Sequence, residues 1–377
     1  MKTTRSVQVI RFVFLTLLFI PLYAGAWDRG TVTTFATLPD GAMHPEGITV
    51  GPHGKIYVST FFGGGTEGQI FVFNRSGRLV RQLNVAGSSP GLLDLAFHPI
   101  TGELLVLDLG AEQVLKVNPY DGTSSLFTMI PNPGGAGTAG PNVLTFDSDG
   151  KVYISDSFQG VIWRTEADGS GITAWVTDPL LQVFSNSTIS PPNNTAVPPF
   201  GANGLAFNND ESAMFVANTG NDQIIKIPVT RDSSGLTAGA PEVFVNSING
   251  ADGLIIDKDD NIWVAANQQD EIVVVEPIEG RVIARLGDFD GIDRYGKVKG
   301  LLFPATIVRD GKYLYVTNLA LDLRGFGLAP PVDAPWAADV TKFTVSKILA
   351  KIPPLEGDRG HDHGHHDDNH NHGNKYH

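Results

Sequence analysis

A strand–turn–strand pattern recurs six times along this chain of 377 residues. Each copy begins with a short apolar run, passes through a turn rich in Gly, Asp and Asn, and enters a second apolar run, as in NVLTFDSDGKVYISDS. The copies align at positions 46, 93, 142, 203, 252 and 304, so the steps between them are 47 to 61 residues long. Repeats of this length, with β-branched and aromatic runs separated by turn residues, are typical of propeller blades. We therefore predict an all-β, six-bladed β-propeller with four antiparallel strands in each blade.

A propeller has to close into a ring, because an open blade leaves a row of unpaired backbone groups at its edge. Residues 31–37 (TVTTFAT) have strand character and precede the first repeat without a neighbouring strand in the sequence. The last repeat is followed by another alternating run, DVTKFTV, at residues 339–345. We predict that residues 31–37 pair with the last blade outside residues 339–345, within a propeller domain that spans residues 27–354.

The first 26 residues have the features of a secretory signal peptide. Three basic residues accompany an apolar run at 12–23, and the small residues Ala-Gly-Ala follow at 24–26. The apolar run is shorter than the roughly 20 residues that a transmembrane helix needs. We expect a secreted or periplasmic protein that begins near Trp27 and has no stable membrane insertion once this segment is removed.

The composition of the remaining chain is acidic and lacks cysteine. Loss of the three basic residues changes the formal net charge from −13 to −16. Nucleic acid is therefore not an expected partner, because its phosphates attract basic surfaces. The sequence does not indicate an oligomeric state.

The tail at residues 355–377 has a different composition. It holds seven of the ten histidines, mixed with Asp, Asn and Gly. Its low apolar content predicts disorder, and such imidazoles can bind zinc, nickel or copper. The histidines expected to capture metal are His361, His363, His365, His366, His370 and His372.

Four repeats carry an oxygen-bearing side chain at the same position, namely Glu46, Asn142, Asn203 and Asp252. The second and sixth repeats have Leu93 and Pro304 there, so the turn itself does not require a polar residue. In a closed ring these equivalent positions converge on the axis. Two carboxylates and two amide oxygens form a hard ligand set. We expect one divalent cation, with calcium as the first choice and magnesium, manganese or zinc as alternatives.

Further polar side chains should lie near the mouth of the channel. The first strand of each repeat starts at the face where the second strand ends, so residues at both places share that face. These candidates are His44, Thr60, Asp108, Asp156, Asn218, Asn267 and Asn318. Each has a structural alternative, because Asn and Asp also cap turns through the backbone. An insertion rich in Pro and Asn at residues 185–200 should form a loop beside the mouth.

The chain resembles the family of senescence marker protein, gluconolactonase and luciferin-regenerating enzyme over residues 31–346. The motifs that carry the resemblance are PEG with Glu46, PN with Asn142, ANGLAF with Asn203 and ADGLIIDKDDNIWVA with Asp252. The resemblance implies a six-bladed propeller in which Glu46, Asn203 and Asp252 bind one divalent metal. It further implies that Asn142 contacts substrate or metal, and that the reaction is hydrolysis of a lactone.

The chemistry of the residues agrees with a hydrolase acting on a small lactone or ester. A metal at the axis would polarise the ester carbonyl, and Asp252 could take a proton from the attacking water. Sugar-lactone members of the family often have an arginine two positions before the substrate asparagine and an aspartate after it. This chain has Gly140 and Val143 at those positions. A less polar lactone or another ester therefore fits as well as gluconolactone.

Other functional classes remain open. Aromatic residues expected at the mouth, Phe61, Phe62, Phe158 and Phe200, would also suit a non-enzymatic NHL-like propeller that binds a protein or glycan. The histidine-rich tail would suit a metal-handling protein. A lyase or synthase is a further alternative, because a fold does not fix a reaction.

Overall fold

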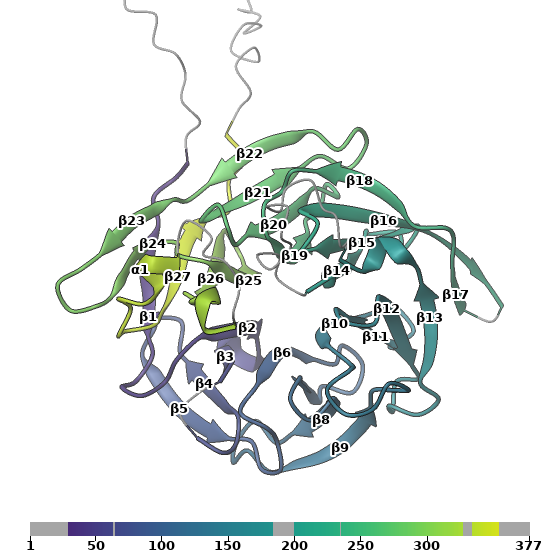
Figure 1. Ribbon diagram of the computed structural model, residues 1–377, viewed down its shortest axis with the longest axis horizontal. Coiled ribbons are helices and arrows are strands. Elements are labelled where there is room, and N and C mark those ends of the chain that lie inside the picture. Colours follow the sequence, from purple (N-terminus) through teal and green to yellow (C-terminus); the bar gives the residue numbers. More distant parts are fainter. Residues whose placement is uncertain (1–28, 63–64, 184–199, 234, 327–333, 354–377) are drawn as a thin grey trace, which may run out of the picture.

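The computed structural model describes residues 29–62, 65–183, 200–233, 235–326 and 334–353. Within these residues, six antiparallel sheets surround a common axis, and each sheet forms one blade of a ring (Figure 1). The prediction of an all-β, six-bladed propeller with four antiparallel strands per blade is confirmed. The predicted signal peptide and histidine-rich tail lie outside the described residues, as do residues 185–199 of the insertion. The domain limits at 27 and 354 stay predictions.

The blades follow one another along the chain. Blade 1 contains β2 (Pro45–Val50), β3 (Ile56–Thr60), β4 (Gln69–Phe73) and β5 (Leu79–Asn84). Blade 2 contains β6 (Leu92–Phe97), β7 (Leu104–Asp108), β8 (Gln113–Val117) and β9 (Ser124–Met129). Blade 3 contains β10 (Pro141–Phe146), β11 (Val152–Asp156), β12 (Val161–Thr165) and β13 (Thr173–Thr177).

Blades 4 and 5 continue this order. Blade 4 contains β14 (Ala202–Phe207), β15 (Ala213–Asn218), β16 (Gln223–Asp232) and β18 (Glu242–Asn246), with β17 (Gly235–Ala238) paired to the end of β16. Blade 5 contains β19 (Ala251–Ile256), β20 (Ile262–Ala266), β21 (Glu271–Val275) and β22 (Val282–Leu286). Blade 6 contains β25 (Pro304–Asp310), β26 (Tyr313–Asn318), β27 (Thr344–Leu349) and β1 (Thr33–Thr37).

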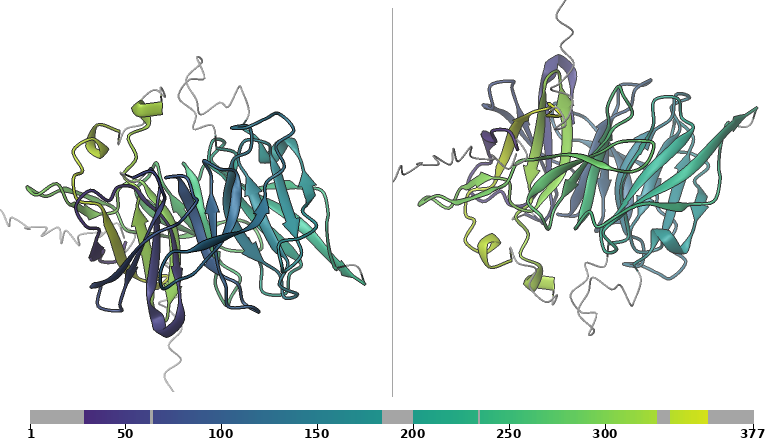
Figure 2. Two further views of the ribbon diagram at one scale, coloured as in Figure 1. Left: turned by 90° about the horizontal axis from the view of Figure 1, so that it is seen from below. Right: turned by 90° about the horizontal axis from the view of Figure 1, so that it is seen from above.

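A few short elements lie outside the blades. The strands β23 (Phe289–Ile292) and β24 (Val298–Gly300) form a separate hairpin between blades 5 and 6. The helical turns are η1 (Pro52–Gly54), η2 (Pro179–Leu181), η3 (Leu323–Phe326) and α1 (Ala334–Ala337). Figure 2 shows η3 and α1 projecting from one face of the ring. No helix among the described residues is long and apolar enough to cross a membrane.

Apolar side chains fill the interface between every pair of neighbouring blades. Six clusters of buried residues, taken from the described chain, each join one blade to the next around the ring. The second strands β3, β7, β11 and β20 are buried along their whole length, so both of their faces pack against neighbouring blades. Burial of this apolar surface is the main force that holds the blades together.

The ring closes where β1 pairs with β27, as predicted. The pairing is antiparallel and joins residues more than 300 positions apart, such as Thr33 with Lys347. The Arg29 guanidinium, just before β1, lies 2.9 Å from the Glu271 carboxylate of blade 5. Residues 29–37 therefore contact both blade 5 and blade 6.

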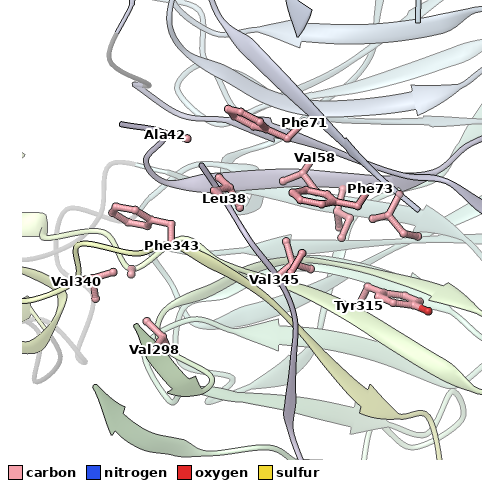
Figure 3. Packing of buried hydrophobic residues seen from close by; sticks show 14 of the residues in the cluster. Leu38, Ala42, Val58, Phe71, Phe73, Val298, Tyr315, Val340, Phe343 and Val345 are labelled. Atoms are coloured by element: carbon pink, nitrogen blue, oxygen red, sulfur yellow. The ribbon is translucent and has the colours of Figure 1, made fainter. Parts of the chain in front are cut away.

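The partner of β1 lies later than the sequence predicted. It spans residues 344–349 instead of 339–345. Val340 and Phe343 are buried in the cluster between blades 1 and 6, so these apolar residues reflect packing of the loop before the strand (Figure 3). The predicted strand therefore began five residues and ended four residues too early.

Phe35 of β1 provides a test of closure by packing. Its ring lies 4.7 Å from the Tyr315 ring of blade 6 and 6.3 Å from the Phe73 ring of blade 1. Phe35→Ala should lower the free energy of unfolding by about 2–3 kcal/mol, since the residue is half-buried and truncation leaves a cavity. Urea denaturation measures this value. Tyr120→Ala is the control, because Tyr120 is 69% exposed, and equal losses in both variants would refute the role of Phe35.

Candidate functional site

A β-bulge at the start of each innermost strand determines which side chains face the axis. In blade 1, Pro45 pairs with Thr60 and Ile48 pairs with Val58, so two residues oppose one. The same shift occurs in the other five blades. Bulges often re-aim side chains beside active sites. Here the bulge brings the second residue of each innermost strand to one ring of positions, which we call the inner ring.

The inner ring contains Glu46, Leu93, Asn142, Asn203, Asp252 and Ala305. The sequence alignment placed Pro304 in the sixth position, and this was wrong. Pro304 pairs with Asn318 as Pro45 pairs with Thr60, so the next residue, Ala305, is equivalent to Glu46. The seven-residue β25 is one residue longer than the other innermost strands, which shifts an alignment based on sequence pattern by one position.

The glycine after several inner-ring residues is required by the neighbouring blade. A Cβ atom on Gly47 would lie 2.3 Å from the carbonyl oxygen of Leu93, and one on Gly204 would lie 2.3 Å from that of Asp252. Contacts this short are forbidden, so only glycine permits the blades to approach. The glycine in the motifs PEG and ANGLAF therefore sets the spacing of the inner ring.

The inner ring opens into a cavity of about 420 Å³, including the part open to solvent. Its lining residues among those described are Glu46, Phe61, Leu93, Asn142, Phe200, Asn203, Thr219, Asp252, Asn267, Phe303, Leu319, Leu321 and Leu323. The fold thus brings together all four oxygen donors that the sequence singled out. No Lys, Arg or His is among these lining residues.

A second ring of residues orients the polar side chains of the inner ring. It consists of the residue directly after the second strand of each blade: Phe61, Leu109, Ser157, Thr219, Asn267 and Leu319. The Asn142 amide donates to Ser157 Oγ at 3.1 Å, and Ser157 Oγ donates to the Ala202 carbonyl at 2.5 Å. The Asn142 amide is therefore held by a hydroxyl that is itself bonded to the next blade.

The same arrangement recurs in blade 4, whereas in blade 5 the residue of the second ring is the donor. The Asn203 amide donates to Thr219 Oγ1 at 2.9 Å, and Thr219 Oγ1 donates to the Ala251 carbonyl at 2.7 Å. The Asn267 amide donates to Asp252 Oδ2 at 3.0 Å. Each bond uses one of the two N–H groups of its amide, and the amide oxygens have no hydrogen-bond partner among the described residues.

Five buried oxygens of the cavity have no hydrogen-bond partner among the described residues. They are Glu46 Oε2, Asn142 Oδ1, Asn203 Oδ1, Asp252 Oδ1 and Asn267 Oδ1. A buried polar atom without a partner costs about 1–3 kcal/mol, and such atoms are rare in folded proteins. Their concentration in one cavity fits a ligand that is attracted to oxygen.

The electrostatics of the cavity also fit a cation. Burial raises the pKa of Asp252 to about 7, although the amides of Asn267 and Asn203 and the Gly253 N–H act in the opposite direction. Burial raises the pKa of Glu46 well above its usual value, and the negative charges of Asp252 and Asp94 add to this shift. Buried carboxylates without a positive partner are costly, and a cation would relieve that cost.

Most of the other predicted mouth residues serve the fold instead of the cavity. Asp156 accepts from the N–H groups of Gly140, Phe158, Gln159 and Trp163. Asn218 donates to two carbonyls of the segment 180–182, and Asn318 donates to Thr344 and Ser346. Asp108 accepts from Ser89 and Gln113. None of these residues, nor Thr60, belongs to the cavity lining of the described chain.

His44 is likewise absent from the described cavity lining. Its Nδ1 lies 2.9 Å from the Leu319 carbonyl oxygen, and its ring packs at 4.7 Å from that of Phe343. Burial lowers the pKa of His44. Its contacts are therefore those of a partly buried structural histidine.

Asn267 lines the cavity because it occupies a different position from the other strand-end candidates. In blade 5 the residue that pairs with the start of the innermost strand is Ala266. Asn267 is one residue later and belongs to the second ring. The sequence alignment grouped it with Asn218 and Asn318, and this was wrong by one residue.

Sequence reasoning missed three residues that support the site. Ser157 and Thr219 follow the strand-end polar residues directly, and this repeated spacing was the available signal. Asp94 follows Leu93 in blade 2, is 5% exposed and accepts from the Leu144 N–H of blade 3 at 3.0 Å. Burial raises the pKa of Asp94 to about 6, against hydrogen bonds from the Leu144 and Leu95 N–H groups. A single carboxylate in an apolar strand gave the sequence analysis no pattern to follow.

The donor set matches a hard divalent cation better than a soft one. No cluster of three or more His, Cys, Asp or Glu side chains suited to a metal occurs in the described part of the chain. The free donors are instead two carboxylate and three amide oxygens. Oxygen-only sets of this kind suit calcium, magnesium or manganese, so the residues present fit such an ion.

Comparison with known proteins agrees with the fold. Residues 198–287 match the family described as SMP-30/Gluconolactonase/LRE-like region. A gluconolactonase from Zymomonas mobilis subsp. mobilis is 26% identical over 178 residues, which cover 44% of this chain and 46% of that protein. The chain thus spans about half the length of the relative that it matches.

Two solved structures illustrate the likeness of the fold. A luciferin-regenerating enzyme has a TM-score of 0.60 at 15% identity, covering 85% of this chain and 95% of its own. A calcium-binding protein, regucalcin from Agrobacterium tumefaciens, has a TM-score of 0.55 at 16% identity, covering 86% of this chain and 96% of its own. At these identities the likeness shows the fold alone. The resemblance predicted from the motifs is confirmed by the match of residues 198–287, which contain blades 4 and 5 of the six-bladed propeller, to the SMP-30/Gluconolactonase/LRE-like region.

Proposed function

We propose that this protein is a divalent-metal-dependent hydrolase of lactones or related esters. The observation that carries the proposal is the group of unpartnered oxygens from Glu46, Asn142, Asn203 and Asp252 in one cavity. The matched gluconolactonase and family region support lactone hydrolysis. Asn203 and Asp252 both lie within the matched region.

We assign Glu46, Asn203 and Asp252 as the residues that would hold one divalent cation. Calcium is our first choice, which the calcium-binding regucalcin of similar fold supports, with magnesium, manganese and zinc as alternatives. When bound, the cation would polarise the lactone carbonyl and stabilise the charge that develops on its oxygen. Asn142 Oδ1 faces the same cavity and would accept a hydrogen bond from the substrate or contact the cation.

We assign Asp252 as the general base. Asn267 holds Oδ2, so Oδ1 is the oxygen available to accept a proton from water. The water oxygen then bonds to the carbonyl carbon, the ring C–O bond breaks, and the ring oxygen gains a proton to give a hydroxy acid. A carboxylate with a pKa near the working pH suits this role, and a bound cation would lower the pKa from about 7.

Loss of the Asp252 carboxylate should abolish most of the activity. Asp252→Asn should lower kcat/KM for lactone hydrolysis by about 10²–10⁴-fold, the usual size of a general-base contribution. A panel of lactones at saturating calcium, manganese and zinc measures the effect. His44→Ala is the matched control, because His44 is absent from the described cavity lining. Undiminished activity of Asp252→Asn would remove the assigned role.

The buried Asp252 should also make the stability of the cation-free protein depend on pH. Its pKa is about 7 in the folded state and about 3.9 when unfolded. Its stabilising contribution is therefore complete below about pH 4 and is lost as the pH rises through about 7. Asp252→Asn stays neutral, so it should gain stability relative to wild type over this range in a chelator. Thermal unfolding measures the difference.

In the presence of calcium at about pH 8, the wild type should be more stable than Asp252→Asn, which reverses the order expected in a chelator. The wild type binds the cation and gains about 2.7 kcal/mol at one hundred times its Kd, whereas Asp252→Asn lacks the negative charge of the carboxylate and should bind the cation more weakly. Asp259→Asn is the control, since Asp259 lies in blade 5 in the turn before β20 and its side chain is 63% exposed. It should follow wild type. If none of the four cations stabilises the wild type, the metal proposal fails and a binding function is favoured.

We further propose that the protein is exported, on the grounds of residues 1–26. Cleavage after Ala26 would make Trp27 the first residue of the mature protein. Mass spectrometry of protein recovered from outside the cytoplasm should find that terminus. Retention of residues 1–26 in that material would contradict cleavage.

A further inference from the structure

The cavity has a polar side and an apolar side. Blades 3, 4 and 5 contribute paired polar residues from the inner and second rings, namely Asn142 with Ser157, Asn203 with Thr219, and Asp252 with Asn267. Blades 6, 1 and 2 contribute apolar residues at the same positions, with Glu46 as the exception. The two halves of one ring therefore differ in chemistry.

The apolar side forms a continuous wall. Its buried residues are Phe61, Leu93, Phe303, Ala305, Leu319, Leu321 and Leu323, and they form one cluster. All of them except Ala305 line the cavity. This cluster is separate from the six that join neighbouring blades. We call it the apolar wall.

Aromatic side chains extend the apolar surface from the cavity to the solvent. Phe61 contacts Phe62, with ring centroids 4.2 Å apart, and Phe62 is 46% exposed. Phe200 lies 5.5 Å from Phe158, which is 37% exposed. Each pair therefore joins an aromatic ring that lines the cavity to a partly exposed one, as is typical of a binding site for an apolar group.

Two residues of this surface have a strained backbone. Phe62 has φ of 54° and Phe303 has φ of 47°. A bulky residue at positive φ is a genuine outlier, and strain of this kind gathers at functional sites.

A polyhydroxylated substrate matches the apolar side of this cavity poorly. Asn142, Asn203 and Asn267 each use one amide N–H on another side chain, and no Lys, Arg or His is among the described lining residues. The apolar wall offers no hydrogen bond, so a hydroxyl placed against it loses its water without replacement. Each such hydroxyl would weaken binding about tenfold or more.

We propose that the preferred substrates are lactones with an alkyl or aryl substituent that packs against the apolar wall. The proposal rests on the proposed lactonase function and names its substrate class. The lactone carbonyl lies at the oxygen donors of the polar side, and the substituent lies on Leu319, Leu321 and Phe61. Hydrolysis adds one water across the ring C–O bond and gives an alkyl-substituted hydroxy acid.

Three lactones with the same six-membered ring test the substrate class. They are unsubstituted δ-valerolactone, δ-decalactone with an alkyl chain, and glucono-δ-lactone. We expect kcat/KM to rise about two- to fourfold for each methylene buried on the wall, and δ-decalactone to exceed glucono-δ-lactone by about 10²-fold. A value for glucono-δ-lactone that equals or exceeds that of δ-decalactone overturns the proposal and leaves the lactonase function intact.

Variants of the wall test the location of the substituent. Leu321→Ser and Leu323→Ser should each lower the ratio of kcat/KM for δ-decalactone over δ-valerolactone by about tenfold. Leu126→Ser is the matched control, because Leu126 is 54% exposed on the outer strand of blade 2, and its ratio should stay unchanged. Circular dichroism reports whether each variant is folded. An unchanged ratio in both folded wall variants overturns the proposal.

Binding of lactams tests the proposed substrate class independently of whether the protein hydrolyses lactones. The lactam analogues of δ-decalactone and glucono-δ-lactone are not readily hydrolysed, and calorimetry on the wild-type protein measures their affinity. We expect the alkyl lactam to bind at least tenfold more tightly. If no lactone is hydrolysed but the alkyl lactam binds more tightly, the reaction is wrong and the assignment of the apolar wall holds. If the polyhydroxylated lactam binds as tightly or more tightly, or if neither lactam binds, the assignment of the wall is wrong.

Discussion

Closure of the ring by β1 and β27 is the constraint on which the rest of this structure depends. The inner-ring residues lie on strands separated by 47 to 61 residues in sequence, and only a closed ring brings them to one axis. Apolar packing between blades supplies the energy, and six inter-blade clusters distribute it evenly. The first and last blades join through strand pairing and through the packing of Phe35 between Tyr315 and Phe73. Without this junction, the cavity would lose the neighbours that define both of its sides.

The unpartnered polar groups of the cavity lower the stability of the folded protein, and packing between the blades offsets that loss. Five buried oxygens have no partner among the described residues, and several carboxylates lie near one another with raised pKa values. Hydroxyl groups of Ser157 and Thr219 connect adjacent blades and hold two of these oxygens in place. The resulting site is preorganised, because the amide orientation is fixed by the fold before any ligand arrives. A lower free energy of unfolding is the expected consequence of such a site.

Individual residues show how far the sequence could be interpreted. Repeat length and turn chemistry were sufficient to predict six blades and a closing strand. The same repeats placed Glu46, Asn142, Asn203 and Asp252 in one equivalent position, and the structure brings them into one cavity. Errors of one residue arose at Pro304 and Asn267, where strand length or register differs from the other blades. Period-two alternation cannot reveal such a shift, because bulges break the alternation at the positions that face the axis.

The sequence by itself determined the blade count, the antiparallel strands and the identity of the four oxygen donors. These follow from local chemistry, since strand periodicity and turn residues act over a few positions. Only the tertiary structure decided which residues surround and orient the oxygen donors. It also decided that the cavity has one polar and one apolar side. Asp94, Ser157, Thr219 and the residues of the apolar wall come from different blades and loops. Their common location depends on ring closure and on the glycines that let blades approach. Both involve contacts between different blades, which the sequence of a single repeat does not specify.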